Sequence, residues 1–473
     1  MNKQTPFWLL TCAVICGLTL PVLFRDGMFM DAILYTAVSK NLANGIGTFW
    51  FPKFSYCGIG GLPTFHEHPP LVFGIQALFF KLLGNSIYTE RLYTVLTGLF
   101  CILLMVYIWK KVTKPEQQAL GWWPLLLWIS IPVCFWSYQN NMQENTMVLF
   151  ILLSFVFYWK VQNSSRFTIV QLFCSAFFVL LAALSKGLPG FFTLALPFLY
   201  WLTMRKITFS KMLVQTALLL FFTLGMLGIL LWIPESSKSL QTYFFKRVLH
   251  RLAQDPTVTS HFYIVGRLIS ELLPSIAITL IVGFVAFRKF KIRPSNEQVR
   301  LALFFISIGC CGALPIMLTM VQKGFCFVPA LPFFGIGLAL LASEGLAVWF
   351  QHVQFNGLHK TLTAIAIVLL IGVGGVTYYL HGTIWREKET MHDIHAFEGI
   401  IPANTVIGAV DTAWSDWTLE TGMMRYNSVS LVNNSNQFDY FLAAKPLTKP
   451  VPEGFALLPL PTVKYDLYRR IQH

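Results

Sequence analysis

The sequence predicts an all-α polytopic membrane protein with a small α/β domain at its C-terminal end. Hydrophobic residues make up 55% of the 473 residues and charged residues only 12%, whereas soluble domains are about a quarter charged. The apolar residues gather in runs of membrane-spanning length, and the last part of the chain lacks such a run. We therefore predict a transmembrane domain over residues 1–380 and a small extracytoplasmic α/β domain over residues 381–473.

Eleven apolar runs are candidate spans, since a transmembrane helix needs roughly 20 mainly apolar residues. They cover residues 7–24, 92–109, 119–138, 146–159, 168–185, 188–204, 212–233, 273–287, 300–320, 325–342 and 361–380. Lys3 precedes the first run as in a signal peptide, but no small-residue cleavage site follows Leu20. We therefore predict that this run is an uncleaved span.

Basic residues predict the orientation of these spans. Lys and Arg concentrate in the short segments on one side, whereas the short turns on the other side carry only Lys186 and Lys323. Because basic residues mark the cytoplasmic side, the N-terminus is predicted in the cytoplasm and the C-terminal domain outside, in a plasma (inner) membrane. The net charge of +14 follows from this distribution, so we predict the lipid bilayer and no nucleic acid as a partner.

Three longer segments are predicted on the outer side: residues 25–91, 234–272 and 381–473. The first contains a helical pattern from Asp31 to Ala43 and an amphipathic segment from Leu71 to Leu83 that is predicted to lie along the interface. The last contains helical stretches and four strand-like runs, Thr405–Val410, Val429–Val432, Tyr440–Ala443 and Gly454–Leu458.

Two polar groups follow the first span closely, in a chain that has only 21 Asp and Glu residues. Asp31 is either an acid favoured by the dipole at a helix start or a general base that accepts a proton from an attacking hydroxyl. His66, Glu67 and His68 precede two prolines that stiffen the chain. Their spacing is compatible with a divalent metal ion, but no clear further ligand is present, so no cofactor is certain.

Further polar candidates lie in the other outer turns. Glu144 lies in a polar turn between two spans, and Lys186 and Lys323 lie in turns where basic residues are rare. Their ordinary interpretation is a solvated turn acid and snorkelling lysines. The second outer segment adds basic residues, and together these cations could bind a phosphate or pyrophosphate. They are Lys246, Arg247, His250, Arg251 and Arg267.

The order of these motifs resembles the polytopic GT-C glycosyltransferases, namely the dolichyl-phosphate-mannose protein mannosyltransferase family and the bacterial aminoarabinose transferases that act on lipid A. Asp31, four residues ahead of Tyr35, is similar to the acidic motif after the first span. His68-Pro69-Pro70-Leu71 matches the mannosyltransferase H-P-P-L motif. Glu67 matches the acid of the aminoarabinose Glu-Lys-Pro motif, and His68 stands where those enzymes have lysine.

Later motifs extend the resemblance across the membrane part. Glu144 stands where the family has a later acid, and Lys186-Gly187-Leu188-Pro189 is similar to a family turn. Lys323 precedes an aromatic residue and a P-x-x-P span start. The resemblance implies a polyprenyl-phosphate sugar donor and an acceptor on the outer face, which is lipid A, a protein or another envelope glycan.

The resemblance also implies roles for the candidate residues. Asp31 is the expected general base, and four cations neutralise the departing phosphate. Glu67, His68 and Glu144 position the substrates or hold an optional divalent ion, which His66 could also bind. One base without a nucleophile pair predicts inversion of the anomeric configuration. The four cations are Lys186, Arg247, Arg251 and Lys323.

Two other functions are compatible with a polytopic chain. A secondary transporter of an anionic or lipid-linked solute is the first, but transporters place ionisable groups near the membrane midplane and often contain repeats. Here the polar groups lie in outer loops, and no repeat is visible. A non-catalytic scaffold whose C-terminal domain binds envelope partners is the second.

The chain also lacks the P-loop, nucleophile-elbow and H-E-x-x-H motifs.

Overall fold

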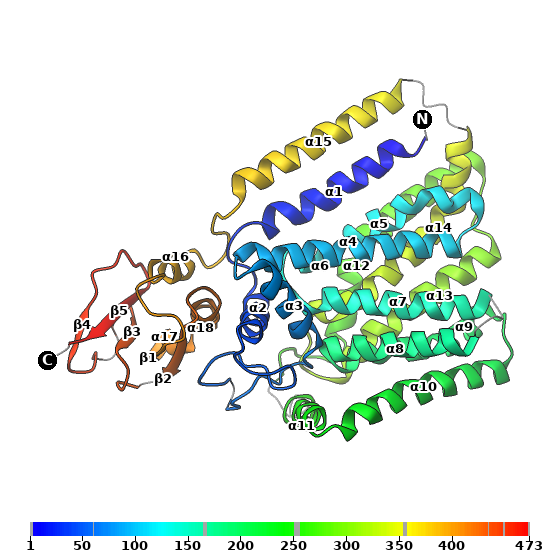
Figure 1. The fold of residues 1–473 in the computed structure, drawn as a ribbon. Helices are drawn as coiled ribbons and strands as arrows, with labels where there is room; N and C mark the ends of the chain where they lie inside the picture. The colour runs from blue at the N-terminus through cyan, green and yellow to red at the C-terminus, as the bar shows by residue number, and fades with distance from the viewer. Residues whose placement is uncertain are drawn as a thin grey trace. The chain divides into compact units, whose positions relative to one another are not determined.

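The computed structural model is mostly helical, with a small sheet near the C-terminus (Figure 1). It describes residues 3–59, 61–163, 168–249, 256–352, 357–433, 435–447 and 450–471. The chain forms two compact units. Unit 1 contains residues 1–21, 94–139 and 143–379, and unit 2 contains residues 22–93, 140–142 and 380–473. The outer segment after the first helix thus groups with the C-terminal segment, whereas the predicted division at residue 380 stays a prediction.

Unit 1 consists mainly of apolar helices, joined by short 3-10 and π-helical turns. Its helices are α1 (Thr5–Leu23), α4 (Ile87–Val112), α5 (Trp122–Ile129), α6 (Pro132–Tyr138), α7 (Gln143–Asn163), α8 (Thr168–Lys186), α9 (Leu196–Met204), α10 (Phe209–Trp232), α11 (Pro234–Tyr243), α12 (Tyr263–Phe290), α13 (Asn296–Ala313), α14 (Leu331–His352) and α15 (Leu358–Leu380). Shorter helical turns are η1 (Pro115–Gly121), η2 (Leu188–Ala195), η3 (Phe244–Val248), η5 (Leu314–Leu318) and η6 (Gly324–Ala330).

Every predicted span coincides with an apolar helical segment. Among the described residues, nine helices are long and apolar enough to cross a membrane. The predicted span 119–138 is instead a pair of helices, Pro115–Ile129 and Pro132–Tyr138, bent by 91°. Pro132 explains the break, because its ring and missing N–H prevent a helix from continuing through it. The predicted span 188–204 is a shorter apolar helix that starts as the 3-10 turn η2.

Buried aromatic rings hold the centre of unit 1 together. The ring of Phe155 on α7 lies 5.1 Å from Phe305 and 5.6 Å from Phe333, so α7 packs with α13 and α14. By contrast, α10 and α15 expose large apolar side chains such as Phe221 and Ile371. Such exposed apolar faces are expected where lipid rather than protein covers a helix.

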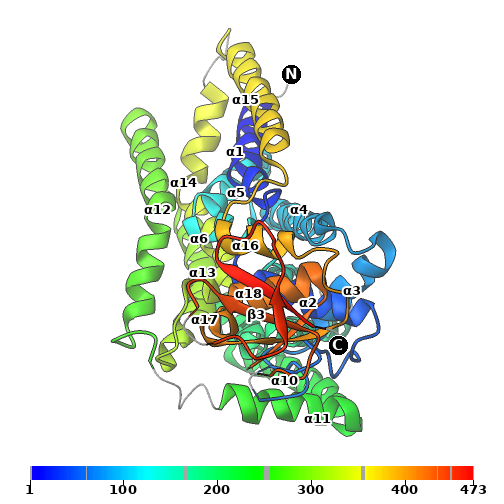
Figure 2. The ribbon, with the colours of Figure 1, turned by 90° about the vertical axis from the view of Figure 1, so that its left-hand side faces the viewer.

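Unit 2 combines two helices of the first outer segment with a five-stranded mixed sheet. The helices are α2 (Met30–Ala43), α3 (Leu71–Leu83), α16 (Lys388–Ala396), α17 (Asp411–Ser415) and α18 (Trp417–Gly422), followed by the π-helical turn η7 (Met423–Asn427). The strands are β1 (Val406–Ala409), β2 (Ser430–Asn433), β3 (Tyr440–Ala444), β4 (Phe455–Leu457) and β5 (Tyr465–Arg470). Figure 2 looks onto this sheet and its short helices.

The strand order β2-β1-β3-β5-β4 confirms the predicted α/β character of the C-terminal segment. Strand β1 is parallel to β2 and β3, and β5 is antiparallel to β3 and β4. The four predicted strands are present. The sequence interpretation missed β5, whose Tyr-Asp-Leu-Tyr-Arg-Arg sequence is half charged, although Tyr465 and Leu467 are fully buried in the core.

Candidate functional site

Helix α2 places Asp31 in its first turn, at the edge of a buried element. The next ten residues, Ala32 to Asn41, are all buried, whereas Asp31 is half-buried. The backbone N–H of Phe29 donates to Oδ1 of Asn140 over 2.7 Å and so anchors the start of the helix. The position suits both interpretations of Asp31, because a helix N-terminus favours a carboxylate and partial exposure leaves it accessible to a substrate.

Tyr35 lies one turn after Asp31 on the same face of α2, since residues four apart are neighbours on a helix. Its hydroxyl is hydrogen-bonded to Nε2 of His68 over 2.9 Å, and the two rings meet edge-on. His68 is buried, and α3 begins directly after the two prolines that follow it. The structure therefore joins two motifs that the sequence interpretation had singled out separately.

A hydrogen-bonded bridge fixes α2 against α3. The side chain of Asn141 donates to Oγ1 of Thr36 on α2 and accepts from Nε2 of Gln76 on α3, each over 2.9 Å. All three side chains are buried, and a buried polar group is costly unless it is paired. The bridge thus holds the Asp31 helix in one position, a role that the sequence interpretation did not assign.

His66 and Glu67 have different surroundings from His68. His66 is buried, and its Nε2 is hydrogen-bonded to Oγ1 of Thr64 over 2.9 Å. Glu67 is half-buried. Across the part of the chain that the structure describes, no group of three His, Cys, Asp or Glu side chains lies close enough to hold a metal ion.

In unit 1, Glu144 and Lys186 form an ion pair between the first turn of α7 and the last turn of α8. The Glu144 side chain is 1% exposed and the Lys186 side chain 10%, so Lys186 is not the snorkelling lysine of the ordinary interpretation. Its Nζ also lies 5.2 Å from the centre of the Phe325 ring, which stacks on Trp136. Acid at a helix start and base at a helix end are each favoured by the dipole.

Gly187 follows Lys186 with φ of +97°. A Cβ there would collide with the hydroxyl of Tyr243 on α11. Only glycine therefore permits both this backbone conformation and the close approach of α11, which brings the second outer segment to the Lys186 turn.

The remaining predicted cations that the structure describes lie in unit 1. Lys323 is exposed, directly before η6, and a Cβ on Gly324 would lie 3.4 Å from Nε of Arg267. Arg267 pairs with Glu271 over 2.5 Å. Arg247 is half-buried on η3, and His250 and Arg251 lie outside the described residues.

Glu271 is a buried acid that the sequence interpretation missed. Its Oε2 accepts from the backbone N–H of Val133 over 2.7 Å, at the start of α6. A carboxylate there satisfies an otherwise unpaired amide donor of the helix terminus. Its role is therefore to hold the break between α5 and α6, and to orient Arg267.

A charged cluster of unit 2, formed by Asp26, Glu90, Arg91, His395 and Arg425, was also not predicted. Arg425 donates to Glu90 over 2.8 Å, Arg91 lies 3.3 Å from Glu90 and 3.6 Å from Asp26, and His395 lies 2.7 Å from Asp26. The carboxylates and both arginines are buried. The cluster joins the start of α4 to α16 and η7, so it fastens the C-terminal segment to the first outer segment.

Lys40 connects this cluster to the helix that carries Asp31. Its Nζ donates to the backbone oxygen of Arg425 over 2.7 Å and to Oγ of Ser428 over 2.8 Å. Burial, with the nearby Arg425 charge, lowers the pKa of Lys40 to about 8. Helix α2 is thus positioned at its end by the C-terminal segment and at its start by Asn140.

The charged cluster predicts that the stability of unit 2 depends on pH. The hydrogen bond to Asp26 raises the pKa of His395 from 6.5 to about 9, so this stabilisation is complete below pH 6.5 and is lost as the pH rises through about 9. Burial alone would raise the pKa of Asp26, but hydrogen bonds with His395 and Tyr426 and the charge of Arg91 lower it overall. The stabilisation that Asp26 provides is therefore lost only when the pH falls into the acid range.

We therefore expect the melting temperature of the full chain in detergent to fall between pH 6.5 and 9, and the His395→Gln variant to lose that part of the pH dependence. Glu398 also pairs with His395, over 2.8 Å. His392→Gln, at a more exposed site on α16, is the control and should keep the wild-type profile. If the melting temperature of all three proteins depended on pH in the same way, His395 would not be the source of this pH dependence.

The apolar helices and the small C-terminal sheet define a polytopic membrane protein with the GT-C glycosyltransferase fold. Residues 67–232 match the family model described as Dolichyl-phosphate-mannose-protein mannosyltransferase. The structure is similar to that of ArnT from Cupriavidus metallidurans bound to undecaprenyl phosphate, with a TM-score of 0.65 and 14% identity over 99% of this chain and 98% of that one. These matches confirm the resemblance inferred from the motifs.

Two further structures share the fold. The apo state of the same ArnT gives a TM-score of 0.63 at 13% identity, covering 96% of both chains. The apo oligosaccharyltransferase of Archaeoglobus fulgidus gives 0.52 at 10% identity, covering 93% of this chain and 65% of that one. A sequence comparison with curated proteins gives no match.

Proposed function

We propose that this protein is a membrane glycosyltransferase that transfers a sugar from a polyprenyl-phosphate donor to an acceptor on the outer face of the plasma membrane. The likeness to ArnT carries the proposal, because it extends over 99% of this chain and that structure holds undecaprenyl phosphate. The match of residues 67–232 to the mannosyltransferase family model supports the same chemistry. The N-terminus is cytoplasmic and the C-terminal segment is outside in this proposal.

Asp31 is the proposed general base. The acceptor oxygen forms a bond to the anomeric carbon while the bond from that carbon to the phosphate oxygen breaks. The acceptor proton passes to Asp31, and the electron pair leaves with the phosphate. The half-buried position of Asp31, on a helix that is otherwise buried from residue 32 to 41, supports this role. One base acting on one face of the sugar gives inversion.

Lys186 is the proposed partner of the departing phosphate, together with Lys323, Arg247 and Arg251. An ammonium group that stabilises charge developing in the transition state must be held in place beforehand. The ion pair with Glu144 and the Phe325 ring hold Lys186 in that way. Glu144 is therefore a positioning residue in this proposal, while Glu67 and His68 orient the acceptor or donor.

Transfer from a defined donor tests the proposal. The purified protein in liposomes is given undecaprenyl-phosphate carrying a labelled sugar, with lipid A, a polypeptide or an oligosaccharide as acceptor. We expect one acceptor to gain the label while undecaprenyl phosphate is released in equal amount. Nuclear magnetic resonance of the product should show an inverted linkage. Uptake of label into sealed liposomes without any transfer would instead favour the transporter.

The Glu144–Lys186 pair gives a test of the assigned roles. We expect Lys186→Gln to lower transfer sharply and to destabilise the protein by about 3–5 kcal/mol, because it leaves the buried Glu144 carboxylate unpaired. The exchanged double variant Glu144→Lys with Lys186→Glu should regain much of the thermal stability but not transfer. If the exchanged double variant regained both thermal stability and transfer, the Glu144–Lys186 pair would serve folding alone.

A further inference from the structure

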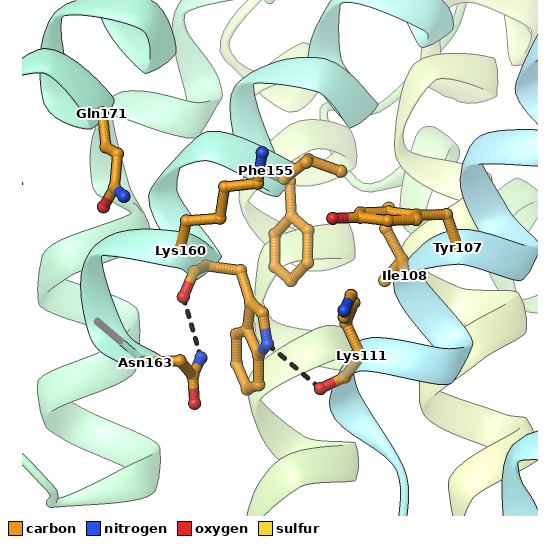
Figure 3. Close-up of a pocket in the computed structure, with 9 residues that line it drawn as sticks. Tyr107, Ile108, Lys111, Phe155, Lys160, Asn163 and Gln171 are labelled. Atoms are coloured by element: carbon orange, nitrogen blue, oxygen red, sulfur yellow. Dashed lines mark hydrogen bonds between the residues drawn. The ribbon is translucent and has the colours of Figure 1, made fainter. Parts of the chain in front are cut away.

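A cavity of about 390 Å³ lies in unit 1 between α4, α7 and the start of α8 (Figure 3). Its wall is apolar, and Ile108, Phe155 and Val156 are buried in it. The other lining residues carry polar groups: Tyr107, Lys111, Trp159, Lys160, Asn163 and Gln171. The side chains of Lys111, Lys160, Asn163 and Gln171 end in N–H donors.

Hydrogen bonds fix the rim of this cavity. The indole N–H of Trp159 donates to the backbone oxygen of Lys111 over 3.3 Å, and Nδ2 of Asn163 donates to the backbone oxygen of Trp159 over 2.8 Å (Figure 3). The first bond ties α7 to α4. The side chains of Trp159 and Asn163 on the rim are therefore held by hydrogen bonds to backbone oxygens.

No acidic residue is among the described residues that line this cavity. In the described ranges, neither Lys111 nor Lys160 forms an ion pair with a carboxylate; their ammonium groups lie 5.7 and 4.8 Å from the rings of Tyr107 and Phe157. An adjoining cavity of about 600 Å³ shares Lys111, Trp159 and Asn163. That second cavity adds Lys114, Lys206, Lys211 and Glu297, of which Lys206 pairs with Glu297 and Lys114 pairs with Glu344.

The cavity is separate from the Glu144–Lys186 pair. Lys160 lies near the end of α7, 16 residues after Glu144, which is about 24 Å along a helix that rises 1.5 Å per residue. Glu144 and Lys186 thus lie at one end of the α7–α8 pair and the cavity at the other, near the depth of the opposite lipid head groups.

Lipid is the natural neighbour of this cavity. Helix α8, which supplies Gln171, exposes Ile169, Val170 and Phe173 with 63, 55 and 43% of their surface. Lysine and tryptophan at a span end often act as simple interfacial anchors, but here they line a cavity between three helices. Basic pockets between helices on the cytoplasmic side suit anionic lipid head groups.

We propose that this cavity binds the phosphodiester head group of an anionic membrane phospholipid. Lys111 and Lys160 bind the phosphate, Asn163 and Gln171 donate to the head group, and an acyl chain follows the apolar wall into the bilayer. Charge complementarity favours an anionic lipid over a zwitterionic one, whose own cation would face the lysines. The apolar wall favours a lipid over a soluble phosphate.

Lipid retention tests this site on the full-length protein. The protein is placed in nanodiscs of phosphatidylcholine alone or mixed with phosphatidylglycerol, then extracted, and bound phosphatidylglycerol is counted by native mass spectrometry. Lys111→Gln with Lys160→Gln should retain at least fivefold less phosphatidylglycerol than the wild type. The control, Lys110→Gln with Lys289→Gln, removes two exposed span-end lysines that line neither cavity and should retain the wild-type amount.

Thermal stability in the same nanodiscs keeps the test decisive if a variant folds poorly. Phosphatidylglycerol should raise the melting temperature of the wild type and of a Lys111→Arg with Lys160→Arg variant, which keeps both charges, and millimolar glycerol phosphate should not. Equal retention by the glutamine variant and its control would overturn the proposal. Stabilisation by glycerol phosphate equal to that by the lipid would overturn the lipid as the occupant.

Discussion

Replacing Asp31 with asparagine is expected to lower the rate of sugar transfer by about 10²–10⁴-fold while the protein stays folded. The amide has the shape of the carboxylate but cannot accept the acceptor proton, and a positioned general base contributes about 10²–10⁴-fold to a rate. Asp31 is half-buried at the start of α2, so the neutral side chain does not leave a buried charge unpaired. The turnover rate should fall by that factor, with little change in KM for the donor. The measurement is release of undecaprenyl phosphate by the purified variant in liposomes.

Two variants separate this prediction from a structural effect. Asp31→Glu keeps a carboxylate and should retain part of the activity, at a rate limited by misplacement of the longer side chain. Asp439→Asn removes an exposed acid elsewhere in unit 2 and should leave transfer unchanged. If Asp31→Asn transferred sugar at the wild-type rate, Asp31 would be no more than an acid at a helix start, and the mechanism proposed here would be wrong.

Local patterns in the sequence predicted much of the fold. The apolar runs gave the helices of unit 1, and the pattern after residue 30 predicted α2 to within one residue. The bend of 91° at Pro132 was not predicted, because the run 119–138 is apolar throughout and periodicity does not register a break. Strand β5 was missed because Asp466, Arg469 and Arg470 mask its buried residues.

Contacts between distant residues could not be read from the sequence. The motif around His68 was recognised, but its hydrogen bond with Tyr35 depends on how α3 packs on α2. Glu144 and Lys186 were both candidates, yet only the antiparallel arrangement of α7 and α8 reveals that they pair. Glu90 and Arg425 are 335 residues apart, and nothing in the neighbourhood of either one indicates the other.

Breaking the pair of Glu90 and Arg425 is expected to be the most destabilising single change in unit 2. The two side chains are 0 and 3% exposed and joined over 2.8 Å, and Arg425 also donates to the backbone oxygens of Asn85 and Ser86. Arg425→Met removes the arginine that lies nearest to the buried Glu90 carboxylate. Loss of one partner from a buried pair costs about 3–5 kcal/mol, which should appear as a large fall in melting temperature.

The same change should also reduce transfer, through Lys40. In the wild type, the backbone oxygen of Arg425 accepts from Lys40 on α2, so loosening η7 loosens the helix that carries Asp31. Hydrogen exchange measured by mass spectrometry should increase in α16 and in the second half of α2. The helices α13 and α14 of unit 1 should keep their protection, because their core does not involve these residues.

A second substitution distinguishes a buried unpaired charge from the loss of a well-packed side chain. Glu90→Leu added to Arg425→Met removes the stranded carboxylate, and Arg91 keeps Asp26 as a partner at 3.6 Å. Since replacing both charges of a buried pair can be nearly neutral, the double variant should be more stable than Arg425→Met alone. Glu297→Gln is the control: it breaks an ion pair whose side chains are 60 and 52% exposed, and such pairs contribute about 0–1 kcal/mol. A double variant less stable than the single one would mean that packing of the Glu90 side chain, rather than its charge, holds the C-terminal segment in place.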